Sequence, residues 1–161
     1  MRLISQFTFS LLVLFFAVSC QSAASAEDIQ VENVWARPSP MVVDNGAIYL
    51  DLVNGTASEE TLLSASSPAC ATTELHTMVM KDDVMMMTPL TEGLVLPAGA
   101  TTSLRPGGDH IMCLGKQVDF TEGEMVEVTL TFADHDPLVV EAEVTSDDTI
   151  QKEQEMTGHG H

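Results

Sequence analysis

The segment "MVEVTLTF", residues 125–132, carries the pattern that decides the fold. Its apolar and polar side chains alternate, and the apolar set is Val126, Val128, Leu130 and Phe132. Because successive side chains of a β-strand point to opposite faces, this alternation predicts a strand with one face in a core. The segments "AIYLDLV" (47–53) and "LVVEAEVT" (138–145) alternate in the same way.

Turn-forming sequences separate such segments, at intervals of about eight to twelve residues. Examples are "DNG" (44–46), "KDD" (81–83), "TEG" (91–93) and "RPGGD" (105–109). We see no segment with the long apolar period of a helix. The sequence therefore predicts an all-β protein, a sandwich or barrel of about eight or nine strands.

The first part of the chain has the layout of an export signal. Arg2 precedes an apolar run over residues 7–18, and "ASA" at 24–26 provides a cleavage site, so we expect a signal peptide over residues 1–26. A lipoprotein signal ending at Cys20 is the less favoured alternative, because Ala17 stands where such signals usually have Leu. Either signal exports the protein, and we expect a periplasmic location without membrane insertion after cleavage.

A single domain should follow, over residues 27–145, since 161 residues suffice for one core and little more. The remaining residues, 146–161, are polar and lack alternation, so we expect a flexible tail.

The charge of the chain limits its partners. A formal net charge of −18 argues against nucleic acid, whose phosphates need Lys and Arg. It also argues against anionic membrane surfaces, and it suits solubility or the attraction of cations. The sequence contains no Ser-His-Asp arrangement, Gly-rich phosphate loop or open zinc site, so we do not expect an enzyme.

Histidine and methionine recur at same-face spacing. In "HTMVMKDDVMMM" (76–87), His76, Met78 and Met80 would share one face of a strand. After the "KDD" turn, Met85 and Met87 would share a face of the returning strand. Further on, His110 and Met112 repeat the spacing. The pattern predicts a hairpin with sulfur on one side and a second His-Met pair elsewhere.

Two interpretations of these residues stay open. Methionine is a common core filler, and histidine in a strand is often a surface residue. Imidazole and thioether together are also the ligands that Cu(I) prefers, whereas zinc recruits thiolate or carboxylate, and calcium takes oxygen.

Cys70 and Cys113 remain after signal cleavage. They could form a disulfide, stay as buried free thiols, or supply a thiolate to a metal. Regular alternation would place Cys70 on the face of His76 and would turn Cys113 away from Met112.

The spacing resembles that of the PCu(A)C family of periplasmic copper chaperones. Met87 lies eleven residues after His76, and a His-x-Met, His110 to Met112, begins twenty-three residues later. The flanking segments are similar too: "VWARPSP", "NGAIYLDLVN", "ASSPACATTELHTMVM" and "GLVLPAGATTSLRPGGDHIM". The resemblance covers about residues 30–145.

This resemblance implies a cupredoxin-like β-sandwich that binds Cu(I) through His76, Met87, His110 and Met112. It also implies delivery of the copper to a copper enzyme, with cytochrome c oxidase or its assembly factors as the receiving protein. Accessory copper contacts would come from Met78 and Met80, and a second copper from tail residues Met156, His159 and His161.

Three alternative functions remain. A periplasmic copper-sequestering resistance protein could share the site, and a metal-free interaction sandwich could share the fold. A blue-copper electron carrier is less favoured, because no histidine follows Cys113 at close spacing.

Overall fold

The computed structural model describes residues 28–146, and strands dominate that part of the chain. The strands are β1 (Ile29–Ala36), β2 (Gly46–Asn54), β3 (Glu60–Ser66), β4 (Cys70–Lys81), β5 (Val84–Pro89), β6 (Leu94–Leu96), β7 (Thr101–Leu104), β8 (His110–Lys116), β9 (Met125–Phe132) and β10 (Leu138–Val144). The all-β prediction is confirmed, with ten strands instead of eight or nine. Two of them, β6 and β7, have three and four residues, too few for alternation to be visible in the sequence.

Several predictions fall outside residues 28–146. These are the signal peptide and its alternative at Cys20, and the tail with Met156, His159 and His161. Among the residues that are described, no helix is long and apolar enough to cross a bilayer.

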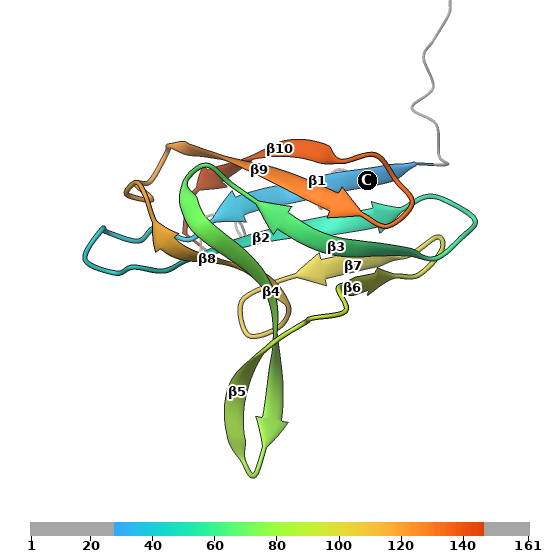
Figure 1. Ribbon diagram of the computed structural model, residues 1–161, viewed down its shortest axis with the longest axis horizontal. Coiled ribbons are helices and arrows are strands. Elements are labelled where there is room, and N and C mark those ends of the chain that lie inside the picture. The colour runs from blue at the N-terminus through green and yellow to red at the C-terminus, as the bar shows by residue number, and fades with distance from the viewer. Residues whose placement is uncertain (1–27, 147–161) are drawn as a thin grey trace, which may run out of the picture.

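One curled sheet forms the body. Its strand order is β5-β4-β8-β2-β1-β10-β9-β3-β6, and β7 pairs with β2. The β1–β10 pair is parallel, and the other strand pairs are antiparallel. In Figure 1, β9 and β10 lie along one side of the body and β6 and β7 along the other, as in a sandwich. The sheet therefore has an inner face toward the core and an outer face.

The core lies between the two layers. Ile48, Leu50 and Leu52 of β2 enter it together with Val128 and Leu130 of β9, and all five are buried. The alternation of both strands thus has the predicted physical cause. On the opposite, outer face of β2, Tyr49 is buried as well, because the ring of Trp35 stacks on it at 4.5 Å between centroids.

The β4–β5 hairpin extends beyond the body. In Figure 1 it projects away from the sandwich, and only the first part of β4 lies against the other strands. Lys81 pairs with Val84, so that Asp82 and Asp83 form a two-residue turn, with φ values of 50° and 61°. This turn type needs positive φ at both positions, which Asp tolerates better than most residues. The "KDD" turn is where the sequence predicted it.

A disulfide joins Cys70 of β4 to Cys113 of β8, with Cα atoms 5.4 Å apart. Both residues are buried. Since both sulfurs are in the disulfide, neither supplies a thiolate. The expectation that Cys70 shares the face of His76 is wrong, because alternation fails at the start of β4, where Ala71 and Thr72 are both exposed.

Candidate metal centre

Strand register brings the candidate ligands onto one surface. His76 of β4 lies directly opposite His110 of β8. Met78 of β4 lies directly opposite Met87 of β5. Directly paired residues of antiparallel strands project to the same face. Ile111 and Cys113 of β8 point into the core, so their neighbours His110 and Met112 point outward. His76, Met78, Met87, His110 and Met112 therefore share the outer face of the sheet.

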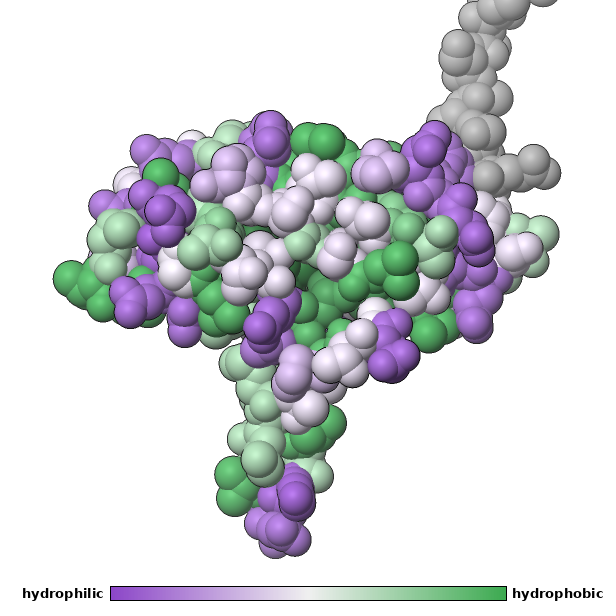
Figure 2. Space-filling model, in the orientation of Figure 1, coloured by the Kyte–Doolittle hydropathy of each residue, from purple (hydrophilic) through white to green (hydrophobic). Residues whose placement is uncertain are grey.

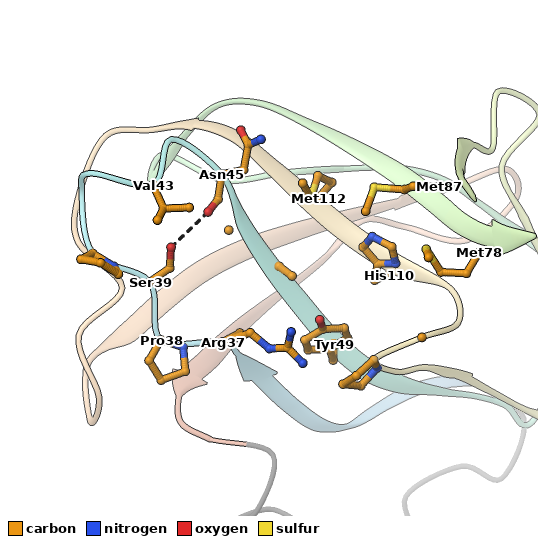
Figure 3. Close-up of a pocket in the computed structure, with 15 residues that line it drawn as sticks. Arg37, Pro38, Ser39, Val43, Asn45, Tyr49, Met78, Met87, His110 and Met112 are labelled. Atoms are coloured by element: carbon orange, nitrogen blue, oxygen red, sulfur yellow. Dashed lines mark hydrogen bonds between the residues drawn. The ribbon is translucent and has the colours of Figure 1, made fainter. Parts of the chain in front are cut away.

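An open cavity of about 570 Å³ lies on this face. Met78, Met87, His110 and Met112 contribute to its lining, and Figure 3 shows the two hairpin methionines beside His110. His76 is not among the lining residues, but its ring meets that of His110 edge to face, with centroids 5.9 Å apart. The two imidazoles and three thioethers thus form one contiguous group.

Each imidazole has one nitrogen held by the protein. Nε2 of His76 donates to Glu74 Oε2 at 2.7 Å, and Nδ1 of His110 donates to the carbonyl oxygen of Gly108 at 2.9 Å. In neutral imidazole the other nitrogen then has a free lone pair. Outer hydrogen bonds of this kind fix the tautomer and orientation of metal-binding histidines.

Nδ1 of His76 is buried and has no hydrogen-bond partner within residues 28–146. An unpaired buried polar atom costs about 1–3 kcal/mol unless something pairs with it. A metal ion that accepts the lone pair of this nitrogen would remove that cost. The neighbouring side chains that could complete such a site are the thioethers of Met78, Met87 and Met112.

The wall of the cavity opposite the hairpin is formed by residues 37–40, 43, 45–47 and Tyr49. Arg37 adds one guanidinium to it, lying 5.7 Å above the centre of the Tyr49 ring. His110 meets the same ring at 6.3 Å, so the aromatic ring supports both.

Lys116 holds this wall by hydrogen bonds. Its Nζ donates to the carbonyl oxygens of Ser39 and Pro40 and to the Ser39 hydroxyl, at 2.5, 3.1 and 2.8 Å. Burial lowers the pKa of the Lys116 ammonium from its ordinary value. Gly46 leaves room for Phe120, since a Cβ there would lie 2.6 Å from the Phe120 ring.

Some predicted residues lie apart from the cavity, and some lining residues were not predicted. Met80 shares the outer face but lies farther along the hairpin, 64% exposed and opposite Met85. Glu74 was missed, although its spacing of two residues from His76 signals the same face. Arg37 and Tyr49 were missed because nothing local in the sequence relates them to a histidine far along the chain.

Comparison with known proteins shows which family the chain belongs to. The sequence profile of the family described as "Putative lipoprotein LpqE-like" matches residues 29–144. Over 109 residues the chain is 31% identical to "Putative lipoprotein Lxx21020" of Leifsonia xyli subsp. xyli. That match covers 68% of this chain and 64% of the relative, so the chain spans less than two thirds of the relative's length.

Solved structures share the fold. The copper-bound PCuAC domain from PmoF2 is 19% identical, with a TM-score of 0.61 over 73% of this chain and 92% of that one, a similarity of fold alone. Apo-DR1885 from Deinococcus radiodurans is 25% identical, with a TM-score of 0.58 over 90% and 97% of the two chains. Its Cu(I) form is 26% identical, with a TM-score of 0.57 over 80% and 84%. The chain belongs to the LpqE-like family, which is the PCu(A)C family.

Proposed function

We propose that this protein is an exported copper carrier that binds Cu(I) through His76, Met87, His110 and Met112. The observation that carries the proposal is the buried Nδ1 of His76, which has no hydrogen-bond partner in the described part of the chain and lies next to His110 and to thioethers on the same face. The solved Cu(I) form of DR1885, which is 26% identical to this chain, supports copper as the metal.

The donor set suits a carrier of a monovalent ion. Thioethers are soft and neutral, and imidazole binds copper in both oxidation states, so the site favours Cu(I) over Zn²⁺ or Ca²⁺. Neutral ligands leave the ion with its single positive charge. Met87 is 46% exposed, so another protein can reach this ligand. We infer that Met87 is the ligand that an incoming protein displaces first.

The protein that receives the copper is proposed from the family resemblance. The PCu(A)C resemblance implies delivery to cytochrome c oxidase or its assembly factors, with sequestration for copper resistance as the second candidate function. The periplasm is the proposed location for both. Deletion strains separate the two: loss of oxidase activity in low copper indicates delivery, and sensitivity to excess copper indicates sequestration.

The binding site is tested by anaerobic Cu(I) titration against a chromophoric Cu(I) chelator. We expect His76→Ala combined with Met112→Ala to lower the affinity by at least about tenfold per removed ligand, which is about 1.4 kcal/mol each. The matched control is His135→Ala combined with Met125→Ala, which also removes one imidazole and one thioether. These residues lie in the β9–β10 loop and at the start of β9, outside the strands that carry the proposed ligands, so the control should bind Cu(I) as the wild type does. Wild-type affinity in the His76/Met112 variant would refute the proposed ligand set.

X-ray absorption of the Cu(I)-loaded protein gives an independent measure, since it counts nitrogen and sulfur neighbours. We expect two of each. The two cysteines of residues 28–146 form the disulfide, so we expect no thiolate-to-copper absorption band. A strong band of this kind in the oxidised protein would favour a blue-copper carrier instead.

A further inference from the structure

The β4–β5 hairpin carries a second pair of methionines beyond the candidate centre. Met80 and Met85 lie directly opposite each other, one step farther from the body than the Met78–Met87 pair. All four project from the same face, because each strand alternates and the pairs are in register. The hairpin therefore carries two thioether pairs in line, which we name the inner pair (Met78 and Met87) and the outer pair (Met80 and Met85).

Core packing does not account for the outer pair. Met80 is 64% exposed and Met85 is 47% exposed, so neither fills an interior space. Figure 2 shows apolar residues along the projecting hairpin, with hydrophilic ones at its tip. Exposed apolar groups in such a cluster usually mark a binding site, since water disfavours them.

Geometry connects the outer pair to the cavity. Residues two apart in a strand are separated by roughly 6.6–6.8 Å, and methionine has three rotatable side-chain bonds. An ion held between Met80 and Met85 is thus within reach of a sulfur of the inner pair. The inner pair in turn lines the cavity together with His110 and Met112.

We propose that Met80 and Met85 form an outer Cu(I) site, from which the ion passes through Met78 and Met87 to the histidine–methionine centre. This inference rests on the proposed function, because the inner destination is the site proposed there. Asp82 and Asp83 form the turn beyond the outer pair, with the Lys81–Val84 pair between. Their two carboxylates outnumber the one ammonium of Lys81, so the charge at the tip favours the approach of a cation.

Each transfer step is a ligand exchange. A sulfur lone pair of the inner pair binds the ion as a sulfur of the outer pair releases it. Copper stays Cu(I) throughout, and no proton moves, because a thioether carries none. In the final step Met78 releases the ion, which keeps Met87 and gains Met112 and the free lone pairs of His76 and His110. The two imidazoles are stronger donors than the thioether they replace, and so they set the direction of transfer.

The hairpin supplies its own control. Met86 is 44% exposed, about as much as Met85, but it pairs with Val79 on the opposite face. Leucine keeps the size and apolar character of methionine without its sulfur. Met80→Leu combined with Met85→Leu removes the outer site, and Met86→Leu removes an equally exposed sulfur outside it.

The test is anaerobic Cu(I) titration of the full mature protein labelled at the methionine methyl carbons, followed by NMR. With the first equivalent we expect shifts at Met87 and Met112, and with further Cu(I) at Met80 and Met85, while Met86 does not shift. Assigned signals also separate this site from Met156 of the tail. In stopped-flow loading, the Met80/Met85 variant should take up Cu(I) about tenfold or more slowly, because capture next to the centre raises the local ion concentration. Met86→Leu should load at the wild-type rate.

Two results would overturn the outer site: unshifted Met80 and Met85 methyls in excess Cu(I), or wild-type loading by the Met80/Met85 variant. If that variant loads normally but loses transfer to a receiving protein, the hairpin is a docking arm, and the proposal is wrong. Failure of the proposed function looks different. In that case His76→Ala leaves first-equivalent binding unchanged, whatever the outer pair does.

Discussion

Removing the disulfide should destabilise the domain strongly while leaving the copper affinity of the folded protein nearly intact. Cys70 and Cys113 are 43 residues apart, and all four proposed ligands lie between them. For a closed loop of this length the chain-entropy relation gives about 13 cal/mol/K, or about 4 kcal/mol at 25 °C. At roughly 4 °C per kcal/mol for a domain of this size, the melting temperature should fall by about 15 °C.

Urea unfolding measures this effect. The single tryptophan of the chain, Trp35, is 5% exposed and stacks on Tyr49, so its emission reports loss of the fold. Three samples are compared: oxidised wild type, wild type with its disulfide reduced, and Cys70→Ala combined with Cys113→Ala. Reduced wild type is the matched control, since it keeps both buried sulfurs and loses only the cross-link. Any further loss in the alanine variant then measures packing.

The copper site should survive this change, because the β4–β8 ladder continues in regular register to the His76–His110 pair. We expect the folded reduced protein to bind Cu(I) within about threefold of the oxidised affinity, below the tenfold that 1.4 kcal/mol would produce. A stability loss under about 1 kcal/mol in the reduced wild type would refute the entropy argument. A large loss of affinity with the fold intact would refute the claim that the ladder alone positions the rings.

Three further predictions test other parts of the structure. Glu74→Ala should weaken Cu(I) binding by about 10- to 100-fold by releasing Nε2 of His76, as measured by chelator competition, and Glu127→Ala on β9 should not. Lys116→Met should lower the free energy of unfolding by about 1–3 kcal/mol in urea and speed amide exchange over residues 39–45, because the loop loses three hydrogen bonds from a charged donor. The carbonyl oxygens of Ser39 and Pro40 each keep a backbone donor, Phe120 N–H and Val43 N–H, so the loop should loosen and not unfold. Exchange at the wild-type rate would contradict this role. The hydrogen bond from His135 lowers the pKa of Asp28. Burial acts to lower the pKa of His135, but its hydrogen bonds to Asp28 and to the Asp136 carbonyl, together with the charges of these two residues, raise that pKa by more. The pair should therefore stabilise the fold most between about pH 3.8 and 6.5, less as pH falls through the lowered Asp28 value or rises through the raised His135 value, and Asp28→Asn should lower the His135 pKa in an NMR titration.

Local chemistry made much of the fold predictable. Alternation identified β9 and β10, and the "KDD" turn identified the β4–β5 hairpin, because side-chain period and turn conformation depend on neighbouring residues alone. The short strands β6 and β7 were missed, since three or four residues cannot show a period. The face shared by Met78, Met80, Met85 and Met87 followed from the same local rule.

The sequence by itself determined which side chains of one strand act together: His76 with Met78, and His110 with Met112. Only the tertiary structure decided that β4 pairs with β8 so that His76 meets His110, that this face points outward, and that Tyr49 and Lys116 support the opposite wall. It also decided the disulfide, by breaking the alternation at Cys70. The physical reason is the distance along the chain over which each effect acts. Periodicity is a property of a few consecutive residues, whereas strand pairing and the choice of buried face depend on how the whole chain buries its apolar side chains.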